Sequence, residues 1–164
     1  MSWRELVDIV TIVGNLAVVG GLWFGIQQLK DYRRGSENTA SMELTRIWNQ
    51  PDFGKHMRLI LGLPEGISGE ELNKQGEQKI EAALVVAMTM ETVGLMVHQD
   101  ILRLDTAWKL IGGMTLESWG RLEGWITLWR VEQENAKFAE WFQWLVIHFK
   151  QIKKTNSFPA YENI

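Results

Sequence analysis

The sequence predicts an all-α protein, with one N-terminal transmembrane helix followed by a small cytoplasmic helical bundle of about five or six helices. Three observations lead to this fold class. Residues 9–26 carry no charge. The rest of the chain repeats its apolar residues at helical spacing, and no region alternates with the period of two that marks a half-buried strand. The length of 164 residues suits one domain with an appendage.

The membrane segment is residues 9–26, IVTIVGNLAVVGGLWFGI. At a rise of about 1.5 Å per residue, a helix of this length spans roughly 27 Å, close to the hydrocarbon thickness of a bilayer. Trp3 lies at one end and Trp23 and Tyr32 at the other, as expected of an aromatic belt. The alternative is a buried helix of a soluble core, but a core helix in so small a domain is rarely apolar on every side.

The flanking charges predict an uncleaved anchor with a defined orientation. The stretch before the segment mixes Arg4 with Glu5 and Asp8, unlike the positive leader of a signal peptide. Basic residues are more numerous on the other side, where they are Lys30, Arg33 and Arg34. The positive-inside rule then places the N-terminus outside and the C-terminal domain in the cytoplasm.

Small residues line one side of the expected membrane helix. Ala17, Gly21 and Gly25 repeat every four residues, with Gly14 close by. Another helix can approach closely along such a stripe. Asn15 lies at mid-bilayer depth, where an amide is costly unless it hydrogen-bonds across a helix interface. The alternative is that glycine is simply common in membrane helices. We expect these five residues to pack against helices of other proteins or of further copies.

We divide the chain into an anchor at 1–30, a helical cytoplasmic domain at 31–153 and a flexible or partner-docked tail at 154–164. The helices expected in the domain share apolar residues at helical spacing. In chain order they are a helix from Ser36 or Ser41, one with Pro51 in its first turn, one opened by a Ser68–Glu71 capping box, one over 77–99, a short one ended by Gly112-Gly113, one capped by Thr115, and one over 136–153.

Four short motifs carry a resemblance: IWNQPDF (47–53), METVGLMVHQDIL (90–102), WITLWR (125–130) and FAEWFQWL (138–145). After an apolar N-terminal anchor, their order resembles an uncharacterised bacterial family of small single-pass membrane-anchored all-helical proteins, known only as a domain of unknown function. The resemblance covers most of residues 5–150. It implies this fold and a place in the bacterial inner (cytoplasmic) membrane, but no activity.

The same pattern suggests two structural features. The second motif resembles a helix end that turns at Gly94 or just beyond. Glu91 and Arg130 are the polar residues that we expect to form a buried pair locking two helices, the alternative being that both are solvated.

The polar residues predict no enzyme, no cofactor and no metal site. The chain has no cysteine, which excludes thiolate zinc and iron–sulfur ligation and a cysteine nucleophile. Its three histidines, His56, His98 and His148, are far apart and form no HExxH pair. No phosphate-binding loop and no Gly-x-Ser-x-Gly elbow occurs. A net charge of −3 gives no electrostatic footprint for nucleic acid.

Tryptophan is the unusual component, with nine in the chain. One face of each helix can form a core, but two or three of these large side chains exceed what so small a core holds. We expect the surplus to form an interface with protein or with the bilayer surface, because tryptophan favours places that are apolar on one side and wet on the other. The expected interface residues are Trp119, Trp125, Trp129, Trp141 and Trp144.

These features predict a non-catalytic membrane-anchored accessory or structural subunit that packs on a larger membrane protein assembly, for example a respiratory or photosynthetic complex. The alternative is a self-assembling membrane effector of a stress or phage-defence type, which acts on the bilayer through homo-oligomers. In both cases the expected partners are the lipid bilayer and either other membrane protein subunits or copies of the same chain.

Overall fold

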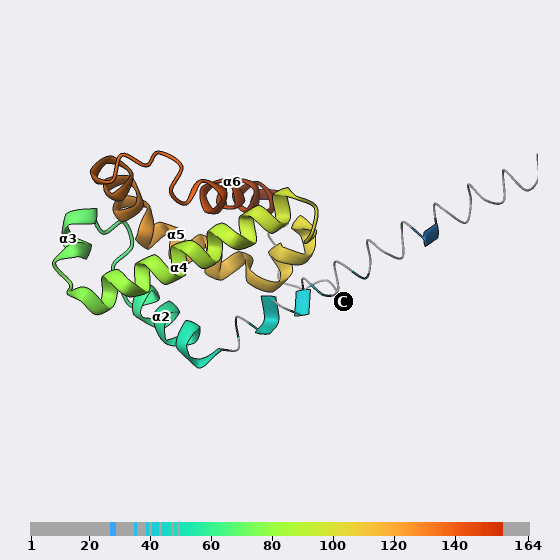
Figure 1. Ribbon diagram of the computed structural model, residues 1–164, viewed down its shortest axis with the longest axis horizontal. Helices are drawn as coiled ribbons and strands as arrows, with labels where there is room; N and C mark the ends of the chain where they lie inside the picture. The colour runs from blue at the N-terminus through green and yellow to red at the C-terminus, as the bar shows by residue number, and fades with distance from the viewer. Residues whose placement is uncertain are drawn as a thin grey trace, which may run out of the picture. The chain divides into compact units, whose positions relative to one another are not determined.

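The computed structural model describes residues 50–155 continuously, together with residues 27, 28, 35, 39, 41, 42, 44–46 and 48 (Figure 1). The chain divides into two compact units, residues 1–39 and 40–164. The predicted anchor at 9–26 and the tail from residue 156 lie outside the described residues. So do the small residues and the amide of the predicted packing stripe, which are Gly14, Asn15, Ala17, Gly21 and Gly25.

The second unit is helical. Its labelled helices are α2 (Pro51–Leu61), α3 (Gly69–Asn73), α4 (Glu77–His98), α5 (Leu104–Glu132) and α6 (Glu140–Thr155). No strand occurs between residues 50 and 155, which confirms the all-α prediction for this part of the chain. The helix α4 is central, because it packs against α2, α3, α5 and α6 (Figure 1).

Two helix starts follow from local sequence, as predicted. Pro51 occupies the first turn of α2, where its missing N–H costs nothing. At α3, the Ser68 hydroxyl accepts from the Glu71 N–H at 3.2 Å, and the Glu71 carboxylate accepts from the Ser68 N–H at 3.2 Å. This is the predicted capping box. The Ser68 hydroxyl also donates to the Glu71 carboxylate, at 3.0 Å. The hydrogen bonds that this carboxylate accepts from the Ser68 N–H and hydroxyl hold the pKa of Glu71 below its usual value.

The predicted helix end at Gly112-Gly113 is wrong, because α5 runs unbroken from Leu104 to Glu132. Gly112 instead leaves room for a tryptophan ring to pack on the helix backbone. A Cβ at Gly112 would lie 2.6 Å from Cζ3 of Trp108, whose indole covers it and meets Phe149 of α6 edge-on at 5.4 Å. Thr115 accordingly caps no helix, and its hydroxyl donates to the carbonyl of Ile111 at 2.9 Å.

The turn predicted at Gly94 or just beyond comes only after the end of α4. The helix α4 continues to His98, and the chain turns at Asp100, whose φ is 56°. Gly94 is where α4 touches the backbone of α6. A Cβ there would lie 2.6 Å from the carbonyl carbon of Trp141, so only glycine permits this contact. The last helix starts at Glu140, later than the predicted residue 136.

The core has two clusters of buried side chains arranged along α5. One joins α2, α3, the first half of α4 and the start of α6, and includes Ile60, Leu72, Trp119, Trp125 and Phe142. The other joins the ends of α4 and α6 to the start of α5, and includes Leu44, Val97, Leu102, Ile111 and Phe149. Both clusters depend on the position of α6 against α4.

Within the described part of the chain, α4 is long and apolar enough to cross a membrane by length and composition, with 44% of its apolar window buried inside the domain. A central core helix meets the same criteria, and α4 contacts four other helices of the domain.

The contact at Gly94 predicts a large difference between two glycine substitutions. Gly94→Ala is expected to lower the free energy of unfolding by about 1–3 kcal/mol, because the methyl group overlaps backbone atoms of Trp141 that cannot move without displacing α6. Thermal unfolding of the full chain, followed by circular dichroism, measures the change.

Gly113→Ala is the matched control, since Gly113 is also helical but has no atom within 4 Å of an added Cβ. It is expected to raise stability by about 0.5–1 kcal/mol, as alanine does in an open helical position. If the two variants unfold alike, the close contact between α4 and α6 does not exist.

Candidate interaction surface

Two of the five tryptophans predicted at an interface lie in the core, so the prediction is wrong for them. Trp119 and Trp125 are 3% and 1% exposed. Trp119 meets Phe142 edge-on at 5.0 Å, and the Trp125 indole N–H donates to Oδ1 of Asn73 at 3.1 Å. The physical reason is the length of α5, because one unbroken helix presents a longer buried face than the two short helices that the sequence suggested.

Trp129 is half-buried beside the connection between α5 and α6. Its ring lies 5.0 Å from that of Trp125 and 5.5 Å from that of Phe138. It packs against the first core cluster. Trp129 therefore closes the edge of the core, and its neighbours come from its own domain.

Trp141 and Trp144 lie together at the surface of the α4–α6 junction, where each is half-buried. The Trp141 ring is 4.2 Å from His98 and 6.2 Å from Trp144, and the Trp144 ring is 4.1 Å from His148. The ring of His98 also meets Trp144 edge-on at 5.4 Å. We call these four residues the aromatic patch.

The histidines of the aromatic patch were not predicted as part of an interface. Their signal in the sequence is spacing, because Trp141, Trp144 and His148 follow at i, i+3 and i+7 on one face of α6. His148 is held in place by a contact of 2.8 Å between its Nδ1 and the carbonyl oxygen of Trp144. The contribution of His98 from α4 depends on the tertiary structure.

Glu91 caps α6 from the neighbouring helix. Its Oε2 accepts the Phe142 N–H at 2.9 Å. Phe142 is in the first turn of α6, where N–H groups have no partner within their own helix. Burial raises the pKa of Glu91 above its ordinary value, and the nearby charge of Glu140 acts in the same direction. The N–H groups of Phe142 and Trp141 and the charge of Arg130 oppose this rise only in part.

Arg130 donates hydrogen bonds to the same segment, mainly to its backbone carbonyl groups. Its Nε donates to the carbonyl of Phe138 at 2.8 Å, its Nη2 to that of Ala139 at 3.2 Å, and its Nη1 to Oε1 of Gln143 at 2.8 Å. Ala139 has a φ of 57°, an unusual value for a residue other than glycine. Arg130 thus holds the chain in a strained turn just before α6.

Glu91 and Arg130 therefore act on one segment, residues 138–143, and their hydrogen bonds run to that segment rather than to each other. We call this arrangement, together with the contact at Gly94, the α6 clamp. The clamp places Trp141 and Trp144 beside His98, so it positions the aromatic patch.

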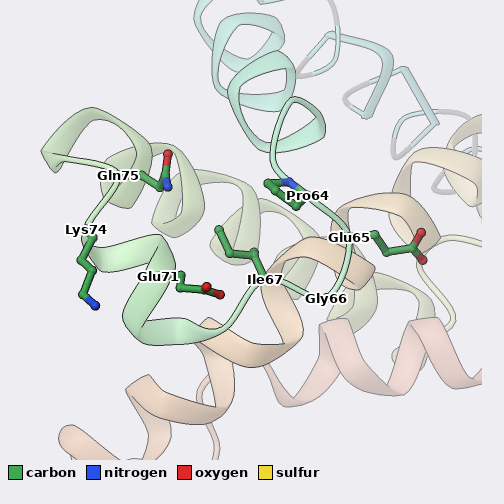
Figure 2. Close-up of a pocket in the computed structure, with 7 residues that line it drawn as sticks. All are labelled: Pro64, Glu65, Gly66, Ile67, Glu71, Lys74 and Gln75. Atoms are coloured by element: carbon green, nitrogen blue, oxygen red, sulfur yellow. The ribbon is translucent and has the colours of Figure 1, made fainter.

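A cleft of about 350 Å³ lies beside α3 and is lined by the residues labelled in Figure 2, which are Pro64, Glu65, Gly66, Ile67, Glu71, Lys74 and Gln75. Its charged groups do not converge. Glu65 and Lys74 extend to opposite sides (Figure 2). The Glu71 carboxylate already accepts hydrogen bonds from Ser68.

A second cleft, of about 510 Å³, lies among α5, α6 and residue 65, and is lined by Glu65, Leu116, Glu117, Arg121, Lys150 and Lys153. Arg121 is engaged there by the carbonyls of Leu63 and Glu117, at 3.0 and 2.8 Å. In the described part of the chain, no three His, Asp or Glu side chains gather as metal ligands.

Between residues 50 and 155 the chain is a small all-α domain built around one central helix, α4, which caps its neighbour α6. A family model described as "Domain of unknown function (DUF4760)" matches residues 15–149, and the chain belongs to this family. This confirms the predicted membership of an uncharacterised family. No curated protein and no solved structure matches the chain.

The raised pKa of Glu91 predicts a pH-dependent difference between the wild type and Glu91→Gln. A carboxyl group with a higher pKa in the folded state binds its proton more tightly there, so wild-type stability falls as pH rises from the ordinary pKa of 4.5 to the raised value. The glutamine variant has no such loss, and its stability relative to the wild type should increase between pH 4 and pH 7 in urea unfolding.

Glu91→Ala is the companion variant, because it removes the acceptor along with the charge. Its free energy of unfolding is expected to be about 1–3 kcal/mol lower than that of the wild type at pH 4 and at pH 7, because the Phe142 N–H is left without a partner. A glutamine variant that loses stability relative to the wild type as pH rises would show instead that the negative charge holds α6 in place.

Proposed function

We propose that this chain is a non-catalytic, membrane-anchored accessory subunit that packs on a larger membrane protein assembly, such as a respiratory or photosynthetic complex. The aromatic patch carries the proposal. Half-buried indoles offer a large apolar face and a polar N–H, and tryptophan is enriched among the residues that dominate binding energy at protein interfaces. The domain buries Trp119 and Trp125 fully, yet it leaves Trp141 and Trp144 at the surface.

The sequence supports the membrane part of the proposal. Residues 9–26 are uncharged and long enough to cross a bilayer as a helix, and the basic residues that follow favour a cytoplasmic position for the helical domain. The stripe of Ala17, Gly21 and Gly25 suits close packing against another helix. The anchor and the aromatic patch would then contact the same assembly, one within the bilayer and one beside it.

Co-purification tests the accessory role. We expect tagged full-length protein, extracted from its natural membranes in mild detergent, to retain a defined set of membrane proteins. Trp144→Ala should weaken this association about 30-fold, as expected when a residue worth about 2 kcal/mol is removed from an interface. Quantitative mass spectrometry of the retained proteins measures the change.

Trp48→Ala is the control, since Trp48 is also a half-buried indole but packs on Phe53 outside the aromatic patch. Thermal unfolding of both variants separates loss of binding from loss of fold. The proposal fails if the wild type leaves the membrane as a clean monomer, or if Trp144→Ala retains the same proteins as Trp48→Ala.

The second candidate function is a self-assembling membrane effector, and the small-residue stripe with Asn15 at mid-depth favours it. Overexpression would then be toxic, and Gly21→Leu would abolish the toxicity because leucine blocks close approach of the helices. Val19→Leu introduces the same side chain on a different helical face and should remain toxic. Growth curves and dye-leakage assays measure this, and harmless overexpression of the wild type would contradict it.

A further inference from the structure

The charge of the helical domain is divided unevenly between α6 and the rest. Residues 50–139 carry nine Lys or Arg and thirteen Asp or Glu side chains, a net charge of −4. The helix α6 has the opposite sign, because Lys150, Lys153 and Lys154 outnumber its one acidic residue, Glu140. Lysines in the last turn suit the negative end of the helix dipole, but Lys150 lies before that turn. The dipole therefore does not account for the whole cluster.

One face of α6 combines this positive charge with an exposed apolar side chain. Ile147, Lys150, Gln151 and Lys154 are all exposed, and their spacing of i, i+3, i+4 and i+7 places them on one side of the helix. Ile147 is 49% exposed. We call these four residues the basic face. The helix runs along one edge of the bundle, so this face points away from the core that its other side enters (Figure 1).

The lysines of α6 are available to an outside partner. None of the three forms an ion pair with a carboxylate of the described residues. Glu140 is ten residues before Lys150, about 15 Å away along the helix axis. Glu65 and Glu117 line the cleft that Lys150 shares with α5, beside the basic face. The face can therefore bind an anionic surface without losing a pair from within the domain.

We infer that the basic face lies on the anionic lipid headgroups of the membrane that holds the predicted anchor. The inference rests on the membrane part of the proposed function, because the anchor keeps the domain close to the bilayer. Residues 27–39 join the anchor to the second unit and reach no further than about 45 Å even when fully extended. The cytoplasmic leaflet, on the side that the flanking charges predict, is the one that exposes anionic lipid.

The residue types of the basic face suit a lipid surface. Lysine can lay its methylene groups along an apolar boundary while its ammonium group reaches a phosphate. Ile147, between the aromatic patch and the lysines, can enter the boundary between headgroups and acyl chains, as the apolar residues of interfacial helices do. The rest of the domain carries a net negative charge, so an anionic membrane repels it and attracts α6.

This placement also orients the aromatic patch. The basic face shares no residue with the patch, which turns toward α4 because Trp141 packs on His98. With the basic face on lipid, the patch faces sideways along the membrane surface. A neighbouring membrane protein would lie on that side, so lipid binding by α6 presents the patch to the assembly of the proposed function.

A fluorophore on α6 tests the inference. The chain has no cysteine, so Ile147→Cys provides a single site for the environment-sensitive dye NBD. We expect its emission in the reconstituted full-length protein to shift to the blue in equimolar phosphatidylcholine and phosphatidylglycerol vesicles, but not in phosphatidylcholine alone. High salt should reverse the shift. Met88→Cys is the matched control, since Met88 of α4 is also 49% exposed, and its label should not respond.

Charge variants test the lysines. Each lysine near an anionic membrane strengthens binding about fivefold, so Lys150→Gln with Lys154→Gln should weaken the contact about 25-fold. Lys55→Gln with Lys74→Gln removes the same charge from exposed positions elsewhere in the domain and should have little effect. The phosphatidylglycerol content that gives half of the dye response measures the difference.

The inference is overturned if the label at position 147 does not respond to phosphatidylglycerol, if both labelled positions respond alike, or if the two double variants behave alike. It is also overturned if the label is shielded in natural membranes but not on pure lipid, since a protein would then cover the face. Flotation with phosphatidylcholine vesicles tests the anchor separately. A chain that does not float there, but whose label responds to phosphatidylglycerol, would contradict the anchor and support the basic face.

Discussion

The start of α6 depends on one hydrogen bond from another helix, in which the Glu91 carboxylate accepts the Phe142 N–H. A helix that begins inside a domain needs acceptors for its first N–H groups, and no side chain of α6 itself is seen to supply one for Phe142. Gly94, one turn along α4, lets the two backbones touch, and Arg130 binds the carbonyls just before the helix. Because both core clusters include residues of α6, this clamp determines how the whole bundle packs.

The features that the sequence predicted correctly are those decided locally. Pro51 and the Ser68–Glu71 capping box set helix starts through neighbours in the chain, and α4 is long enough for its helical pattern to be clear. Gly94 and Gly112 were misread because their roles lie in tertiary contacts, with the backbone of Trp141 and the ring of Trp108. Trp119 and Trp125 were misplaced for the same reason, since the size of the core follows from α5 being one helix.

The candidate surfaces could be found only in part from the sequence. Trp141 and Trp144 were expected at an interface and do lie at the surface, but their association with His98 arises where α4 and α6 meet. The exposure of Leu84 and Met88 could not be predicted, because the apolar residues of α4 continue past the part that the domain covers. The helix α4 thus supports the core and, through the clamp, positions the aromatic patch.

Hydrogen exchange of the Phe142 amide tests the clamp most directly. Amides in the first turn of a helix normally exchange quickly, because they have no partner within the helix. If Glu91 caps α6, the Phe142 amide exchanges as slowly as amides of the core. The Gln78 amide, in the first turn of α4 where no side chain caps the helix, exchanges fast in the same sample. Equal, fast exchange at Phe142 and Gln78 would show that Glu91 does not hold α6.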